Sequence, residues 1–190
     1  MVLGLLFINP SQADDVKEFQ VDGISIGDSI LEYYNEKKIK KAIKKGYYYK
    51  NEKFVDIFIK PKKGSTYKEL QITIKPKDNS YIVHAIAGQI NYKNNIEECY
   101  LEKKKVVQEI KNLFSNNIEI QNYKDKHSVD KSGKSTFEGT SFFLKDGTIK
   151  IECFDWSKKY KYKGKSLIDK MMISIGGQEF IDFMVNEAYN

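Results

Sequence analysis

Alternation of apolar and polar residues in short runs is the feature that most constrains how this chain can fold. After Gly46, apolar side chains recur at every second position, and Gly, Pro, Asn and Asp separate the runs. Such alternation indicates half-buried strands, and short turns between them imply antiparallel neighbours. Asp146–Gly147 is a strong hairpin signal between two of the runs. The expected strands are 54–59, 67–75, 81–92, 118–123, 137–145, 148–156 and 166–175.

Helical signals occur before, between and after these strands. Ser29 followed by Glu32 is a capping box, and Asn95 with Glu98 marks a second helix start. The expected helices are 29–45, 95–114 and 180–188. This order predicts an α+β fold, an antiparallel sheet of about six to eight strands with two or three helices packed on one face.

The first thirteen residues resemble the back half of a secretion signal. Val2–Ile8 is an apolar run, and Ser11 and Ala13 place small residues before a cut between Ala13 and Asp14. The run is far shorter than the roughly 20 apolar residues that span a bilayer. We therefore expect export to the periplasm or the medium after signal cleavage, with 14–190 as a single α+β domain. The alternative is a buried N-terminal strand.

Both cysteines are expected to point toward the core. Cys99 falls on the apolar face of the second helix, and Ile149, Ile151 and Cys153 share one side of a strand. In an exported chain, two inward cysteines predict one disulfide that ties helix to sheet. A pair of separately buried thiols is the alternative, which a cytosolic location would favour.

The chain carries a net charge of +6, and all 32 basic residues are Lys. Sequence-specific binding of nucleic acid is not expected, because Arg supplies the planar fork that recognises base edges and phosphates. The first helix has a basic face, and tyrosines lie among lysines near position 160, which favours an anionic membrane or polymer surface as partner. An AT-rich genome would also encode many lysines, and tyrosines also suit half-exposed strands. The candidate binding residues are Lys37, Lys38, Lys41, Lys44, Lys45, Tyr160 and Tyr162.

Few residues suggest catalysis. His84 lies in an apolar strand, where a hydrogen-bonded structural role is the ordinary one. His127, with Asp125 and Asp130 nearby, is the candidate catalytic group, in a polar loop at 124–136 that we expect to be mobile. Neither a nucleophile elbow nor a metal-ligand spacing occurs in the sequence, so no metal and no cofactor are expected.

Two resemblances bear on function. Ile26–Tyr33 is similar to the Gly-x-[Ser/Thr]-x-x-[Glu/Asp]-aliphatic opening of small envelope modules such as the outer-membrane assembly lipoprotein BamE and the β-lactamase inhibitor protein, without their lipidated Cys. That resemblance implies helices on an antiparallel sheet and protein binding rather than catalysis. Cys99–Lys104, His127–Thr136 and Cys153–Ser157 resemble a family of small exported proteins of unknown function from AT-rich marine bacteria. This second resemblance implies a secreted domain with two cysteines.

The sequence therefore predicts a non-catalytic binding module for an envelope protein or an anionic envelope component. The alternative is a small hydrolase or transferase that uses His127 with Asp125 or Asp130. A third interpretation, a basic cytosolic protein that binds nucleic acid, requires the first thirteen residues to remain attached.

Overall fold

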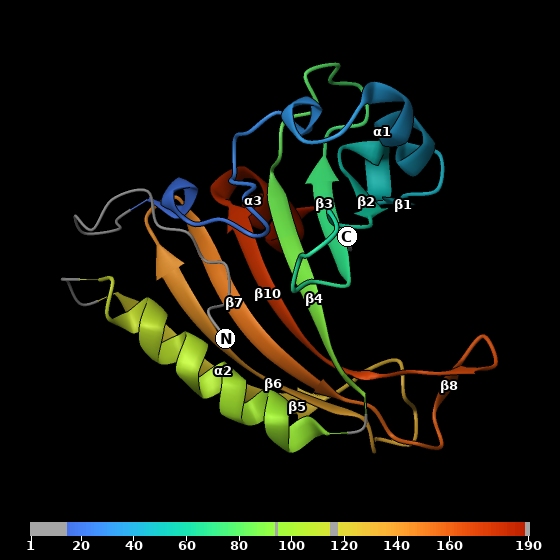
Figure 1. Cartoon of the computed structure of the whole chain (residues 1–190), viewed down its shortest axis with the longest axis vertical. Helices are drawn as coiled ribbons and strands as arrows, with labels where there is room; N and C mark the ends of the chain where they lie inside the picture. Colours follow the sequence, from blue (N-terminus) through green and yellow to red (C-terminus); the bar gives the residue numbers. More distant parts are fainter. Residues whose placement is uncertain (1–14, 94, 115–117, 189–190) are drawn as a thin grey trace.

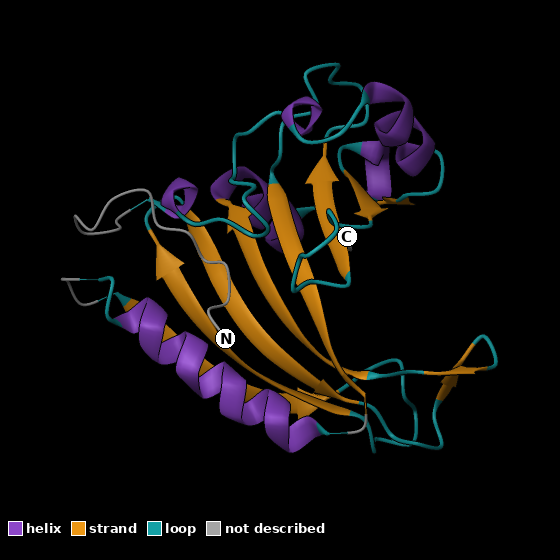
Figure 2. Cartoon of the chain, in the orientation of Figure 1, coloured by secondary structure: helices purple, strands orange, loops and turns teal. Residues whose placement is uncertain are grey.

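The chain forms an eight-stranded antiparallel sheet that is flanked by helices (Figures 1 and 2). The computed structural model describes residues 15–93, 95–114 and 118–188. The strands of the sheet are β1 Tyr47–Tyr48, β2 Val55–Ile59, β3 Glu69–Ile74, β4 Ala85–Lys93, β5 Glu119–Lys126, β6 Thr136–Leu144, β7 Gly147–Asp155 and β10 Asp169–Gly177. Their order across the sheet is β1-β2-β3-β4-β10-β7-β6-β5. The α+β class and the antiparallel sheet are confirmed.

Three α-helices lie in the described part of the chain. They are α1 Glu36–Ile43, α2 Ile96–Lys111 and α3 Gln178–Asn186, and three single turns of 3-10 helix are η1 Val16–Glu18, η2 Ile30–Glu32 and η3 Lys50–Glu52. The first expected helix is divided, because Ser29 caps only η2 and Asn35 starts a new helix. The Asn35 side chain accepts a hydrogen bond from the Lys38 backbone N–H at 2.9 Å.

The two faces of the sheet are distinguished by the alternation along β10. Met171, Ile173 and Ile175 are buried on the first face, where α2 packs across β4, β7 and β10. The helix α1 also packs on this first face, through Ile39, whereas α3 packs against Ala85 on the second face, behind the sheet in Figure 1. Two helices, α1 and α2, therefore share one face as expected, and α3 covers the other face.

Close packing explains why α3 folds onto the second face. Gly176 lies at the end of β10, and its lack of a side chain lets α3 approach the sheet closely. A Cβ at this position would lie 2.9 Å from the Ile181 Cδ1. The helix is anchored by an aromatic cluster of Tyr49, Phe54, Phe180 and Phe183. Because these rings come from distant segments, the alternation alone did not predict the side on which α3 lies.

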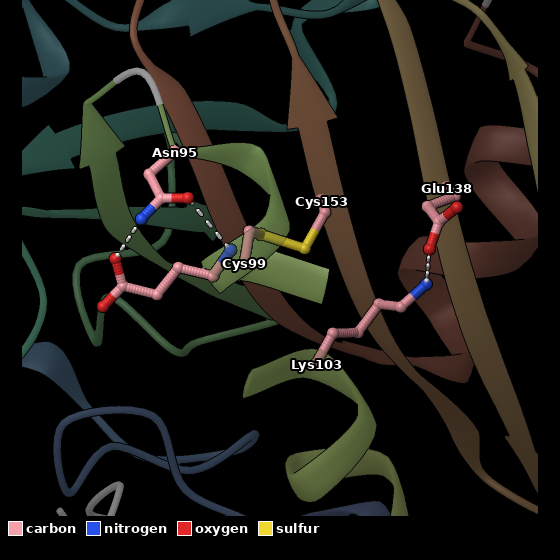
Figure 3. Close-up of a disulfide and its surroundings, with 6 residues drawn as sticks. Asn95, Cys99, Lys103, Glu138 and Cys153 are labelled. Atoms are coloured by element: carbon pink, nitrogen blue, oxygen red, sulfur yellow. Dashed lines mark hydrogen bonds and ion pairs between the residues drawn. A yellow bond between two sulfur atoms is a disulfide. The ribbon is translucent and has the colours of Figure 1, made fainter. Parts of the chain in front are cut away.

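The disulfide between Cys99 and Cys153 links α2 to β7 (Figure 3). The two Cα atoms are 6.1 Å apart and both side chains are fully buried, so the predicted bridge is confirmed. The helix start predicted at Asn95 and Glu98 is also present, since the Glu98 N–H donates to Asn95 Oδ1 at 3.4 Å and the Asn95 Nδ2 donates to Glu98 Oε2 at 3.0 Å.

A small hairpin that the sequence did not predict precedes β10. It comprises β8 Lys161–Tyr162 and β9 Lys165–Ser166, and it projects from the sheet in Figure 1. Lys163 and Gly164 form its turn with φ values of 48° and 80°. Its residues are all exposed, which is why no apolar alternation marked it.

Two predictions concern membranes and export. None of the described helices is long and apolar enough to cross a membrane. The predicted cut between Ala13 and Asp14 lies outside the described residues.

Candidate functional site

A hollow of about 520 Å³ lies between α1 and β2, and lysines provide most of its lining. We call it the basic hollow. The lining residues that come from α1 and its C-terminal end are spaced three or four positions apart, so they share one face of the helix. The residues that line the basic hollow are Lys38, Lys41, Ala42, Lys45, Phe58, Ile59 and Lys60.

The described residues that line the basic hollow include no carboxylate, so the lysines of the lining are not balanced by an acidic side chain within it. Lys38 Nζ donates to the Lys60 carbonyl oxygen at 3.3 Å and lies 4.1 Å from the centre of the Tyr34 ring. Burial lowers the pKa of Lys38. Lys41 and Lys45 take part in no ion pair with the described residues, whereas Lys40, outside the hollow, pairs with Glu36. An anion that enters the hollow therefore meets several positive charges at once.

The structure brings the predicted lysines together but separates them from the predicted tyrosines. A second hollow of about 460 Å³ on α1 is lined by Glu36, Lys37, Lys40, Lys41 and Lys44. All five predicted lysines thus lie on α1 or just after it. Tyr160 and Tyr162 lie beside and within β8, at a distant end of the molecule (Figure 1).

Phe58 and Lys60 are site residues that the sequence analysis missed. The ring of Phe58 is 46% exposed, although its neighbours Ile57 and Ile59 are buried. The alternation of β2 does place Phe58 on the side opposite these two residues, so a signal was present. The proximity of Phe58 to α1 could not be predicted from the sequence, because it depends on how the helix packs against the strand.

His127 lies at the end of β5, among aromatic side chains. Its ring is 4.4 Å from that of Trp156 and about 6 Å from those of Phe137 and Phe154, between ring centres. Its Nδ1 is buried and has no hydrogen-bond partner among the described residues. Burial, and to a lesser extent the charge of Lys170, lower the pKa of His127. Both effects favour the neutral form of the imidazole.

The two carboxylates predicted to act with His127 have other partners. Asp130 accepts hydrogen bonds from the backbone N–H and the hydroxyl of both Ser132 and Ser135, which hold the pKa of Asp130 at about 2. Asp125 accepts from the Lys126 backbone N–H at 2.7 Å. In the described ranges no hydrogen bond joins either carboxylate to His127, and Asp130 instead holds together the loop that we expected to be mobile.

The second face of the sheet carries a groove of about 290 Å³ beside α3. Ala85, Ala87 and Met172 form part of its floor, and Phe180 and Met184 form part of its wall. Neither this groove nor any other described part of the chain gathers three or more side chains suited to bind a metal ion.

The lowered pKa values of the two histidines predict that the stability of the fold depends on pH. The pKa of His127 and of His84 is lowered by burial, so below about pH 6.5 the unfolded chain binds more protons than the folded one and stability falls with acidity. We expect wild type to lose stability relative to a His127→Gln variant as the pH falls from about 7.5 to about 5. Urea denaturation of both proteins across this range measures the difference. A difference that stays constant would contradict a lowered pKa, and His84→Gln tests the other histidine in the same way.

Comparison with known proteins adds no assignment: no family model matches the chain, and neither a curated protein nor a solved structure is significantly similar to it.

Proposed function

We propose that the protein is a non-catalytic binding module that recognises a negatively charged component of the cell envelope through the basic hollow. The observation that carries this proposal is the set of lysines at Lys38, Lys41, Lys45 and Lys60, which line one hollow with no acidic side chain among them. Lysines attract anions as hydrated point charges without demanding a fixed geometry. Ala42, Phe58 and Ile59 add apolar contact area beneath these charges.

Export is part of the proposal, and the disulfide supports it. Disulfides persist in oxidising compartments and are rare in the cytosol. Cleavage after Ala13, as proposed from the sequence, would release the domain into such a compartment with its net charge of +6 intact, because residues 1–13 contain no charged side chain.

Catalysis by His127 has less support than binding. A general base needs a neighbour that holds its ring in one tautomer and orientation. Asp130 is fully engaged by serines, and aromatic rings surround the imidazole. These contacts favour a structural role for His127.

Exchange of three lysines tests the proposed function. We expect the combined variant Lys38→Gln, Lys41→Gln and Lys45→Gln to lose about a hundredfold in affinity for an anionic surface, since each lysine near such a surface contributes about 1 kcal/mol. Binding to polyglutamate, an acidic polysaccharide and vesicles of phosphatidylglycerol would be measured by titration. Wild-type binding should weaken as salt is added, because exposed charges are screened over about 8 Å at physiological ionic strength.

A matched control removes the same charge from a distant surface. Lys104 and Lys111 are exposed on α2, and Lys145 is exposed in the turn between β6 and β7, so the combined exchange of these three lysines to Gln lowers the net charge equally. This control should bind the probes almost as wild type does. Equal losses in the two variants, or no binding of wild type to any of the three probes, would overturn the proposed function.

A further inference from the structure

The strand β2 has an open edge beside the basic hollow. On one side β3 pairs with all of Val55–Ile59. On the other side β1 pairs only with Val55 and Asp56. Within the described ranges no strand lies beside β2 beyond Asp56 on this side, and the last two residues of β2, Phe58 and Ile59, line the hollow.

The backbone hydrogen bonds show which groups this edge presents. The Tyr49 N–H donates to the Phe54 carbonyl at 3.2 Å, so these residues form a hydrogen-bonded pair at the start of the β1–β2 ladder. Alternate residues of an antiparallel strand bond to the same neighbour, so Phe54, Asp56 and Phe58 direct their backbone groups toward the β1 side. Because β1 ends opposite Asp56, the N–H and C=O of Phe58 lie beyond it without a strand partner.

One carbonyl just beyond this edge already accepts a hydrogen bond from a lysine side chain. The next outward carbonyl after that of Phe58 belongs to Lys60, and it accepts a hydrogen bond from Lys38 Nζ at 3.3 Å. Unpaired edge groups are a template for pairing with another chain, and lysines beside an edge select which chain can approach. A second copy of this protein, with a net charge of +6, would be repelled, whereas an acidic segment would be attracted.

We infer that the open edge of β2 takes an extended, acidic segment of a partner protein as an additional antiparallel strand. This inference rests on the proposed function, because it uses the same lysines. The segment continues the line of β1, and one of its residues exchanges two hydrogen bonds with Phe58. The partner residue opposite Phe58 lies on the second face, next to the exposed Phe58 ring. We expect it to be apolar, because directly opposite side chains on one face pack against each other. Its two neighbours point to the first face, where α1 presents Lys38, Lys41 and Lys45 to their carboxylates.

Binding of N-methylated peptides tests the added strand. The probe is a peptide of about ten residues in which Glu and Val alternate. Methylation of the Val amides removes the donors that face Phe58, and methylation of the Glu amides alters the outer edge while leaving the charge the same. We expect the first change to weaken binding by about tenfold or more and the second to have little effect. Amide hydrogen exchange at Phe58 should slow when the unmethylated peptide binds.

The outcomes separate this inference from the proposed function. If all three peptides bind equally and the Lys38, Lys41 and Lys45 variant loses all of them, charge recognition stands and strand addition is overturned. If only phosphatidylglycerol vesicles or the acidic polysaccharide bind, the partner is not a protein segment and the inference fails. If neither peptides nor surfaces bind, both the inference and the proposed function fail.

Discussion

Removal of the disulfide between Cys99 and Cys153 is expected to lower the free energy of unfolding by about 4 kcal/mol. The bridge closes a loop of 54 residues, and the loss of chain entropy in the unfolded state scales with the logarithm of that length. Domains are typically stable by only about 5–15 kcal/mol, so the effect is a large share of the total. Urea denaturation of wild type with and without reductant measures it, together with the shift in Tm.

The double variant Cys99→Ala and Cys153→Ala is the matched control for reduction. Reductant should leave its stability unchanged, and its Tm should lie near that of reduced wild type. Both sulfur atoms are joined in the disulfide, so thiol reagents should not label the protein before reduction, even when it is unfolded. A Tm that reductant does not move would contradict the stabilising role of the bridge.

The local pattern of the sequence was enough to predict the sheet and the disulfide. Along β7, Ile149, Ile151 and Cys153 alternate with exposed or half-exposed residues, and all three are buried in the structure. Asn95 and Glu98 marked the start of α2 to the residue, because an N-cap is a contact between near neighbours. From these two segments the inward direction of Cys99 and Cys153 followed without any knowledge of the fold.

Only part of the candidate site was predicted, because its residues come from α1 and β2, which are brought together by tertiary packing. The five lysines were found from the helix pattern, but the wall formed by Phe58 and Lys60 comes from β2. The open edge beside Phe58 depends on where β1 ends, and β1 is only two residues long. Likewise, the contact of His127 with Trp156 joins the ends of β5 and β7, which lie on either side of β6 in the folded sheet.

Two adjacent phenylalanines on β6 show how much the two faces of the sheet differ in burial. Phe142 is fully buried on the first face, and its ring stacks on that of Phe114 with 6.2 Å between ring centres. Phe143 lies on the second face and is 37% exposed. The same residue type at neighbouring positions therefore provides a matched comparison.

Phe142→Ala is expected to lower the free energy of unfolding by about 3–5 kcal/mol, because it removes a fully buried ring and leaves a cavity beneath α2. Phe143→Ala should lower it by less than about 1 kcal/mol, since much of that ring is already in water. Urea denaturation of both variants gives the comparison, and Phe142→Leu, with a smaller expected loss, serves if the Ala variant does not fold. Equal losses at the two positions would mean that the faces of β6 are not divided between core and solvent as the structure shows.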